Sequence, residues 1–191
     1  MRYLTSGLIA ENASDAAFLL PLLQAELTRI GWDAGFEALE IQSAEVTTVM
    51  SANSVAQAAA DLLESNDLLF VHRDLREAAK IERLRAKIAD EHRVVPVVPI
   101  RETEAWVLAA AIGAQQIEML DTTAPEKGCR WVERLADPKA ELRRRYRGRR
   151  STEDLFTLIA EQADLAKLAE VPAYQSFMHD LTKALKELNF L

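Results

Sequence analysis

Residues 67–80 read DLLFVHRDLREAAK, and this stretch decides the predicted fold. The apolar run Leu68–Val71 is uninterrupted, which is typical of a central parallel strand that is covered on both faces. The polar residues His72, Arg73 and Asp74 follow at once, and a helix-forming segment comes next. These polar residues mark either the plain exit of a strand to the surface or the carboxyl end of a parallel strand, where open α/β sheets place their ligands.

Strand-like and helix-like segments alternate on both sides of this stretch. The predicted strands are Tyr3–Ala10, a part of 36–50, Leu68–Val71 and Val94–Ile100. The predicted helices between them follow Glu11, span Ser54–Glu64 and span Arg76–His92. This alternation predicts a doubly wound α/β fold, in which a mostly parallel sheet with right-handed crossovers is flanked by helices.

The first predicted helix has Ser14 as its N-cap and Asp15 as an acidic residue in its first turn. Pro21 is expected to bend this helix or to mark a late start. Beyond Arg101 only helical patterns follow, and no sequence repeat is present. We therefore predict one domain over 1–191, with an α/β core at 1–110 and a helical C-terminal extension at 111–191.

Composition favours a cytoplasmic protein with one core. The chain has 191 residues, 49% of them hydrophobic, which is enough to bury one sizeable core. The single cysteine, Cys129, cannot form an intrachain disulfide and is expected to be inert. The sequence predicts neither a signal peptide nor a membrane span. A net charge of −7 argues against wholesale coating by nucleic acid, although an average can conceal a local reversal.

Four acidic residues fall where the predicted strands end: Glu11, Asp74, Glu102 and Glu104. The carboxyl ends of parallel strands lie at one edge of a sheet, so these side chains are expected to converge. Convergent carboxylates raise one another's pKa and are stable together mainly when a cation or a basic side chain lies among them. Their oxygen atoms are the ligands that Mg²⁺ and Mn²⁺ prefer.

Several motifs resemble those of Toprim-like proteins. The segment GLIAENASDAAFLLPLL (7–23) resembles the glutamate-bearing first motif, and LLFVHRDL (68–75) resembles the second. The segment IRETEAWVLA (100–109) is similar to a signature of a bacterial family of unknown function, related to the nuclease domain of overcoming-lysogenisation-defect proteins. The segments DPKAELRRRYRG (137–148) and FMHDLTKAL (177–185) resemble the C-terminal part of that family.

The resemblance implies a Toprim/Rossmann-like fold and a metal-dependent nuclease site. Glu11 would be the acid/base or metal-anchoring residue, Asp74 a metal ligand, and Glu102 or Glu104 a further acidic group. His72 stands where the family has the first of two aspartates, and Asn12 where a glycine is common. Histidine can ligate Mn²⁺ but is a poor Mg²⁺ ligand and brings no negative charge, so with His72 among its candidate ligands the metal site is expected to be weak, altered or absent.

Each of these residues also has a structural interpretation, and both interpretations stay open at this point. Glu11 can simply begin a loop, and Asp74 can cap the next helix. His72 can be a hydrogen-bonding residue of the interior, and Glu102 can be an acid of a first helical turn. Trp106 beside Glu104 is predicted to lie in the core.

The net negative charge of the chain is reversed locally in a basic segment, which is the predicted nucleic-acid-binding surface. Its cationic residues are Lys139, Arg143, Arg144, Arg145, Arg147, Arg149 and Arg150. Guanidinium groups bind phosphate oxygens, and Tyr146 among them offers a face for a base. The alternative is a solvated helix face that makes salt bridges with Glu141, Glu153 and Asp154, or an interface to an acidic partner.

The leading functional hypothesis is a nuclease or related phosphodiester-processing protein of Toprim type, acting in bacterial phage defence or DNA repair with Mg²⁺ or Mn²⁺. The alternative is a non-catalytic nucleic-acid-binding or protein-docking subunit that retains the fold. A partner ATPase is a further expectation, since the chain has no GxxxxGK[ST] motif of its own.

Overall fold

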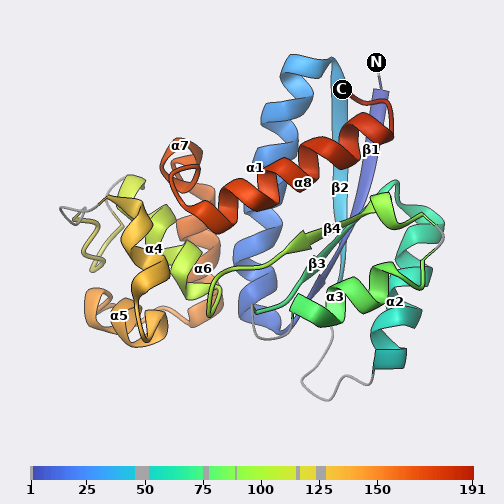
Figure 1. Cartoon of the computed structure of the whole chain (residues 1–191). Coiled ribbons are helices and arrows are strands. Elements are labelled where there is room, and N and C mark those ends of the chain that lie inside the picture. Colours follow the sequence, from blue (N-terminus) through green and yellow to red (C-terminus); the bar gives the residue numbers. More distant parts are fainter. Residues whose placement is uncertain (1, 46–51, 75–77, 89, 115–116, 124–127) are drawn as a thin grey trace.

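The computed structural model of the chain describes residues 2–45, 52–74, 78–88, 90–114, 117–123 and 128–191. Within these ranges the chain forms a four-stranded parallel sheet in the order β2-β1-β3-β4, flanked by helices (Figure 1). The strands are β1 (Arg2–Ala10), β2 (Phe36–Glu45), β3 (Leu68–His72) and β4 (Val94–Val97). The predicted α/β class, with a mostly parallel sheet flanked by helices, is confirmed.

Helices connect the strands and then form the C-terminal part of the chain. Those between strands are α1 (Ala13–Ala34), α2 (Ala52–Ser65) and α3 (Ala78–Arg85), with a 3-10 turn, η2 (Glu91–Arg93), before β4. After β4 come α4 (Glu104–Gly113), η3 (Cys129–Arg134), α5 (Pro138–Arg145), α6 (Thr152–Glu161), α7 (Leu165–Leu168) and α8 (Pro172–Glu187).

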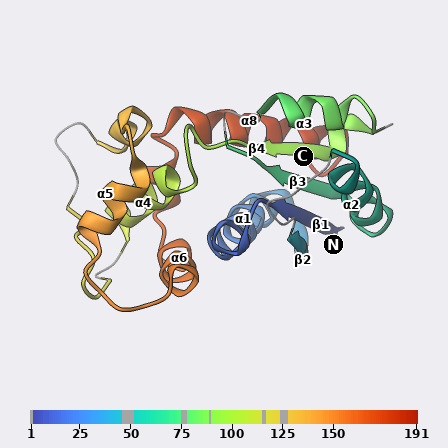
Figure 2. The ribbon, with the colours of Figure 1, turned by 90° about the horizontal axis from the view of Figure 1, so that it is seen from below.

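The side chains of the central strands alternate between two apolar layers. In β3, Leu68 and Phe70 face the layer that contains α1, α4 and α8, whereas Leu69 and Val71 face the layer of α2 and α3. Figure 2 shows α1 and α2 on opposite sides of β1 and β3. All five residues of β3 are buried, as expected for a parallel strand covered on both faces.

Helix α1 begins two residues earlier than the sequence predicted. Its N-cap is Asn12, whose Oδ1 accepts the backbone N–H of Asp15 at 2.9 Å, so the assignment of Ser14 as the cap was wrong. The Ser14 hydroxyl donates to the same Asn12 oxygen at 2.7 Å. Pro21 lies inside the helix without ending it, and Gly35 ends it in a left-handed conformation (φ 71°) that favours glycine.

Other predicted boundaries also differ from the structure: the strand predicted for Val94–Ile100 ends at Val97. The helix predicted for Arg76–His92 ends at Arg85, and a turn and η2 separate it from β4; residues 75–77 and 89 lie outside the described residues. The strand predicted within 36–50 is β2, and its predicted continuation over 46–50 also lies outside the described residues. Pro96 is tolerated in β4 because this strand lies at an edge of the sheet.

The C-terminal helices share one hydrophobic cluster with the sheet. Helix α8 crosses the sheet in Figure 1, and its Phe177 contacts Phe70 of β3 with ring centroids 6.2 Å apart. Trp106 of α4 is fully buried, as predicted, and its ring meets that of Tyr174 edge-on at 5.0 Å. None of the helices that the structure describes is long and apolar enough to cross a membrane. The single domain over 1–191 stays a prediction.

One buried polar contact fastens α8 to α1. The Tyr174 hydroxyl donates to Glu26 Oε1 at 2.6 Å, and Glu26 Oε2 pairs with the Arg29 guanidinium at 2.6 Å. Burial and the neighbouring Glu26 carboxylate raise the pKa of Tyr174 well above its usual value. The phenol therefore stays protonated and remains a donor to the carboxylate.

Replacing Tyr174 by Phe is expected to lower the free energy of unfolding by about 2 kcal/mol, because it removes a buried hydrogen bond to a charged group. Denaturant unfolding of Tyr174→Phe, Glu26→Gln and the double variant forms a cycle that isolates the contact. Strictly additive effects of the two substitutions would show that the two side chains do not stabilise each other.

Candidate functional site

The candidate site lies where the connections from the central strands diverge. From β1 the chain passes through α1 to β2 on one side, and then through α2 to β3 on the other side of β1. Such a topological switch point leaves a crevice at the carboxyl ends of the two central strands, where open α/β sheets bind ligands. Glu11 follows β1 there, and Arg73 and Asp74 follow β3. Ile9 pairs with Val71, so Glu11 and Arg73 each lie two residues beyond a paired position.

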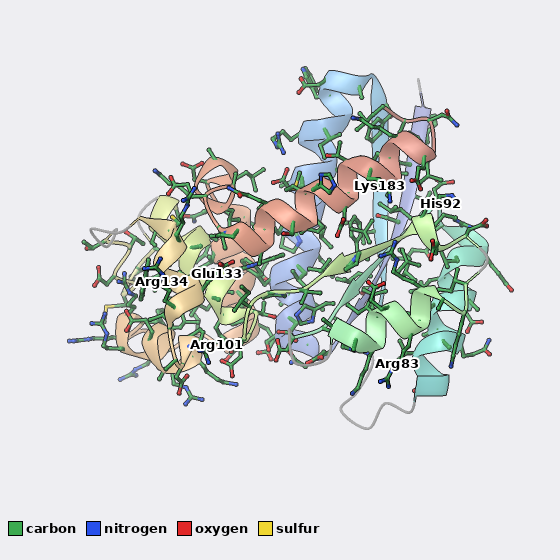
Figure 3. The ribbon with its side chains drawn as sticks, viewed as in Figure 1. Arg83, His92, Arg101, Glu133, Arg134 and Lys183 are labelled. Atoms are coloured by element: carbon green, nitrogen blue, oxygen red, sulfur yellow. The ribbon has the colours of Figure 1, made fainter. Side chains whose placement is uncertain are left out.

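The loop between β4 and α4 brings Glu102, Thr103 and Glu104 to the same edge of the sheet. Arg101, which precedes them, is exposed and has a left-handed backbone (φ 74°), an unusual and strained conformation for a residue other than glycine. Figure 3 shows Arg101 on the lower side of that view, together with the start of α1 and with α5. The carboxyl ends of three strands therefore contribute to one edge, as the sequence predicted.

The carboxylates act on one another electrostatically at this edge. The pKa of Asp74 is raised to about 7 by burial and then by the negative charges of Glu11, Asp15, Glu102 and Glu104. The pKa of Glu104 is also raised, chiefly by burial. Within the ranges that the structure describes, however, no three His, Cys, Asp or Glu side chains are placed closely enough to enclose a metal ion.

A buried guanidinium lies among these carboxylates. The Arg73 side chain is only 3% exposed, and its Nε lies 3.8 Å from Glu11 Oε1. Its Nη1 donates to the carbonyl oxygen of His72 at 2.9 Å, and its backbone N–H donates to Val97 O at 3.2 Å. Arg73 thus supplies part of the positive charge that converging carboxylates require.

His72 is a neutral interior residue. Burial, together with the charge of Arg73, lowers the pKa of His72 to about 3. Its Nε2 lies 3.0 Å from Thr103 Oγ1, within hydrogen-bonding distance. This contact agrees with the interpretation of His72 as a hydrogen-bonding residue of the interior. Its Nδ1 lies 3.6 Å from Asp15 Oδ2, and because the ring is neutral this contact is not an ion pair near pH 7. A ligand role for His72 stays a prediction.

Asp15 is a site residue that sequence reasoning missed. The sequence predicted it only as an acidic residue in the first turn of a helix, yet its side chain is 9% exposed and faces His72. Burial raises the pKa of Asp15 to about 6, while a hydrogen bond from Thr103 opposes this rise. The available signal was its spacing from Glu11, since a strand end and the next helical turn lie at the same edge.

The basic segment begins beside the acidic residues. Lys139, in the first turn of α5, has its Nζ 3.8 Å from Glu104 Oε1. Arg143, one turn further along the helix, also lowers the pKa of Glu104, in opposition to burial. The predicted shared face of Lys139 and Arg143 is therefore turned toward the acidic edge.

Two arginines of the segment pair with a carboxylate within the fold. Glu141 accepts hydrogen bonds from Arg144 at 2.7 and 2.8 Å and from Arg145 at 2.8 Å, and these contacts lower its pKa to about 2. Arg145 is 9% exposed, lies 5.3 Å from the centre of the Trp131 ring and donates to the carbonyls of Asp121 and Thr123. Arg144 and Arg145 thus form the salt bridges that the alternative interpretation of the basic segment predicted.

Comparison with family models, with curated proteins and with solved structures finds no match to this chain. The resemblance to Toprim-like proteins therefore stays a prediction from the motifs.

Replacing Asp74 by Asn is expected to raise the melting temperature at pH 8 by on the order of a few degrees and to leave it nearly unchanged at pH 4. The folded-state pKa of Asp74 is about 7, above the ordinary value of 3.8, so the native protein holds a proton that the unfolded chain loses. Stability linked to this group is therefore lost as the pH rises from about 4 to 7. Asn mimics the protonated carboxyl and removes this loss.

Thermal unfolding in EDTA across this pH range measures the effect. The matched control is Asp33→Asn, which removes an exposed carboxylate near the other end of α1. An equal pH dependence in wild type and Asp74→Asn would contradict the raised pKa.

Arg145→Ala is expected to lower the free energy of unfolding by about 2 kcal/mol, because it leaves two carbonyls and Glu141 with fewer donors. Arg144→Ala removes the same charge from a side chain that is 62% exposed and is expected to change stability by less than about 1 kcal/mol. Urea unfolding compares the two variants, and equal losses would refute the structural role of Arg145.

Proposed function

We propose that the chain is a metal-dependent phosphodiester-processing protein, a nuclease of Toprim type, whose site is the carboxyl edge of the sheet. The observation that carries the proposal is the convergence of Glu11, Asp74, Glu102 and Glu104 from three strand ends at the topological switch point. A fold needs no such concentration of like charge for its stability, so a function that uses a cation and a polyanion is the better explanation.

The donor set fits a hard divalent cation. Glu11 Oε1 and Glu102 Oε2 are buried and accept no hydrogen bond from the residues that the structure describes. Carboxylate oxygens of this kind suit Mg²⁺ or Mn²⁺, which keep several waters in such sites. Because no three acidic side chains of the described residues enclose a metal ion, one or two of Glu11, Asp74, Glu102 and Glu104 would hold the cation, and water would supply its other ligands. A bound cation would polarise a phosphate oxygen and stabilise the charge that develops on it.

The other groups of the site have separate roles in this proposal. Glu11 transfers a proton to or from the reacting oxygen, since its carboxyl is both partly exposed (26%) and beside a guanidinium. Arg73 holds Glu11 in position and limits the repulsion between the acids. Lys139 and Arg143 offer cationic groups next to Glu104, where the phosphate of a substrate would lie.

One observation favours a second candidate, a non-catalytic nucleic-acid-binding or protein-docking subunit. Arg73 lies 3.8 Å from Glu11 Oε1 and takes a place near the carboxylates that a cation would otherwise occupy. His72 brings no negative charge, unlike the aspartate that the resembling family carries at this position. In this candidate the fold is retained and the acidic edge binds no metal.

The biological setting follows from the motif resemblance. A nuclease related to the overcoming-lysogenisation-defect proteins would act in the cytoplasm, in phage defence or DNA repair. ATP hydrolysis would then come from a partner ATPase, because the chain has no phosphate-binding GxxxxGK[ST] loop.

The test is cleavage and cation binding by the full chain with Mn²⁺ or Mg²⁺. Wild type is expected to cleave single-stranded or duplex oligonucleotides, and Glu11→Gln to reduce the rate by about 100-fold or more, as for loss of an acid/base group. Asp74→Asn is expected to weaken Mn²⁺ binding, measured calorimetrically at pH 8, whereas Asp33→Asn leaves both properties unchanged. Absence of Mn²⁺ binding in wild type, with oligonucleotide binding retained, would replace the nuclease by the second candidate.

A further inference from the structure

The residues that follow α5 form a closed loop, Tyr146–Arg150. The backbone N–H of Arg150 donates to the Tyr146 hydroxyl oxygen at 3.0 Å, which joins the two ends of the loop. The backbone N–H of Arg147 donates to Met119 O at 3.0 Å, and the Tyr146 side chain packs in part against the hydrophobic core. The loop is thus fixed at both ends, although its arginine side chains are exposed.

Gly148 lets the backbone of this loop pack directly against the Tyr146 ring. A Cβ atom added at Gly148 would come closer than van der Waals contact to the hydroxyl oxygen, Cζ and Cε2 of Tyr146. Any other residue would therefore displace the Tyr146 ring and break its hydrogen bond to Arg150. In the sequence Arg-Gly-Arg-Arg that follows Tyr146, this geometry requires the glycine.

The three arginines of the loop differ from the two that precede them. Arg147, Arg149 and Arg150 are exposed and form no ion pair with the residues that the structure describes. Arg144 and Arg145 are already paired with Glu141. Three unneutralised guanidinium groups on a fixed loop are a strong local reversal in a chain with a net charge of −7.

We infer that the Tyr146–Arg150 loop is a preformed anion-binding loop that holds the sugar-phosphate backbone of a nucleic acid. This inference rests on the proposed function for the identity of its ligand, and it names the residues that bind the strand outside the acidic edge. Lys139 lies beside Glu104 at the start of α5, and the loop follows the end of that helix. Eight helical residues span about 12 Å, so the strand would extend along α5 from the acidic edge to the loop.

The composition of the loop favours nucleic acid over an acidic protein. Protein interfaces derive most of their affinity from buried aromatic or apolar anchors, and the one aromatic ring of the loop, Tyr146, is already half-buried against the core and Gly148. Contacts to phosphates need only cationic donors and backbone geometry, and a guanidinium can bind two phosphate oxygens at once. A loop that is already ordered loses less entropy on binding.

The experiment measures the affinity of the full chain for a fluorescent oligonucleotide across a salt series, in EDTA. Arg147→Ala/Arg149→Ala/Arg150→Ala is expected to reduce the slope of log affinity against log salt by about 2, since three phosphate contacts with a single strand are lost. Arg144→Ala removes an arginine that is paired with Glu141 and lies outside the loop; it is the control and is expected to keep the wild-type affinity and slope.

A second pair of variants tests whether the loop is preformed without changing its charge. Tyr146→Phe removes only the hydroxyl that closes the loop, and Gly148→Ala displaces the ring; each is expected to weaken binding about fivefold. Wild-type affinity in Tyr146→Phe, or a wild-type salt slope in the triple variant, would overturn the inference. Equal affinity of wild type for polyglutamate would overturn the nucleic-acid ligand. If the wild-type protein binds the oligonucleotide but does not cleave it when Mn²⁺ is added, only the proposed nuclease activity would be overturned.

Discussion

The burial of β1 and β3 on both faces is the constraint on which the rest of the site depends. A strand covered by helices on both sides has no polar face, so its charged groups have to lie beyond its ends. In β3 the apolar run stops at Val71, and His72, Arg73 and Asp74 occupy the carboxyl end. Because β1 runs parallel to β3 and the chain leaves them in opposite directions, their crossover connections diverge at the edge between them.

Charge at this edge is balanced only in part. Asp74 lies within electrostatic reach of four other carboxylates, and burial removes the water that would screen them. Arg73 opposes this repulsion from within, and Lys139 opposes it from α5. His72 adds neither sign of charge, since burial keeps its imidazole neutral. Burial and then this imbalance of charge raise the pKa of Asp74, and a bound cation would lower it.

The fold could be predicted from the sequence because the strands are short apolar runs separated by helical periodicity. The position of the acids at one edge followed from the same argument, since parallel strands end on the same side. The start of α1 was misplaced because Asn12 and Ser14 are both good caps, and only the hydrogen bond to Asp15 distinguishes them. Asp15 was missed because its burial depends on Thr103 and His72, which come from distant parts of the chain.

The basic segment marks the limit of prediction from composition. Its seven cations look alike in the sequence, yet tertiary contacts give them three different surroundings. Arg145 is fixed by Trp131 and by carbonyls more than twenty residues away, which no local pattern reveals. Lys139 and Arg143 face the acidic edge, and the loop arginines project beyond the helix.

This division changes what the segment can do. A uniformly basic helix would attract any polyanion without orienting it, because exposed charges interact weakly and at long range. Here Glu141 pairs with Arg144 and Arg145, whereas Lys139 and Arg143 lie at the acidic edge and three further arginines lie on the loop. Two separated cationic points define a direction on the surface. A strand bound at both points would pass Glu104 and Asp74 in one orientation, which a catalytic edge needs and simple adhesion does not.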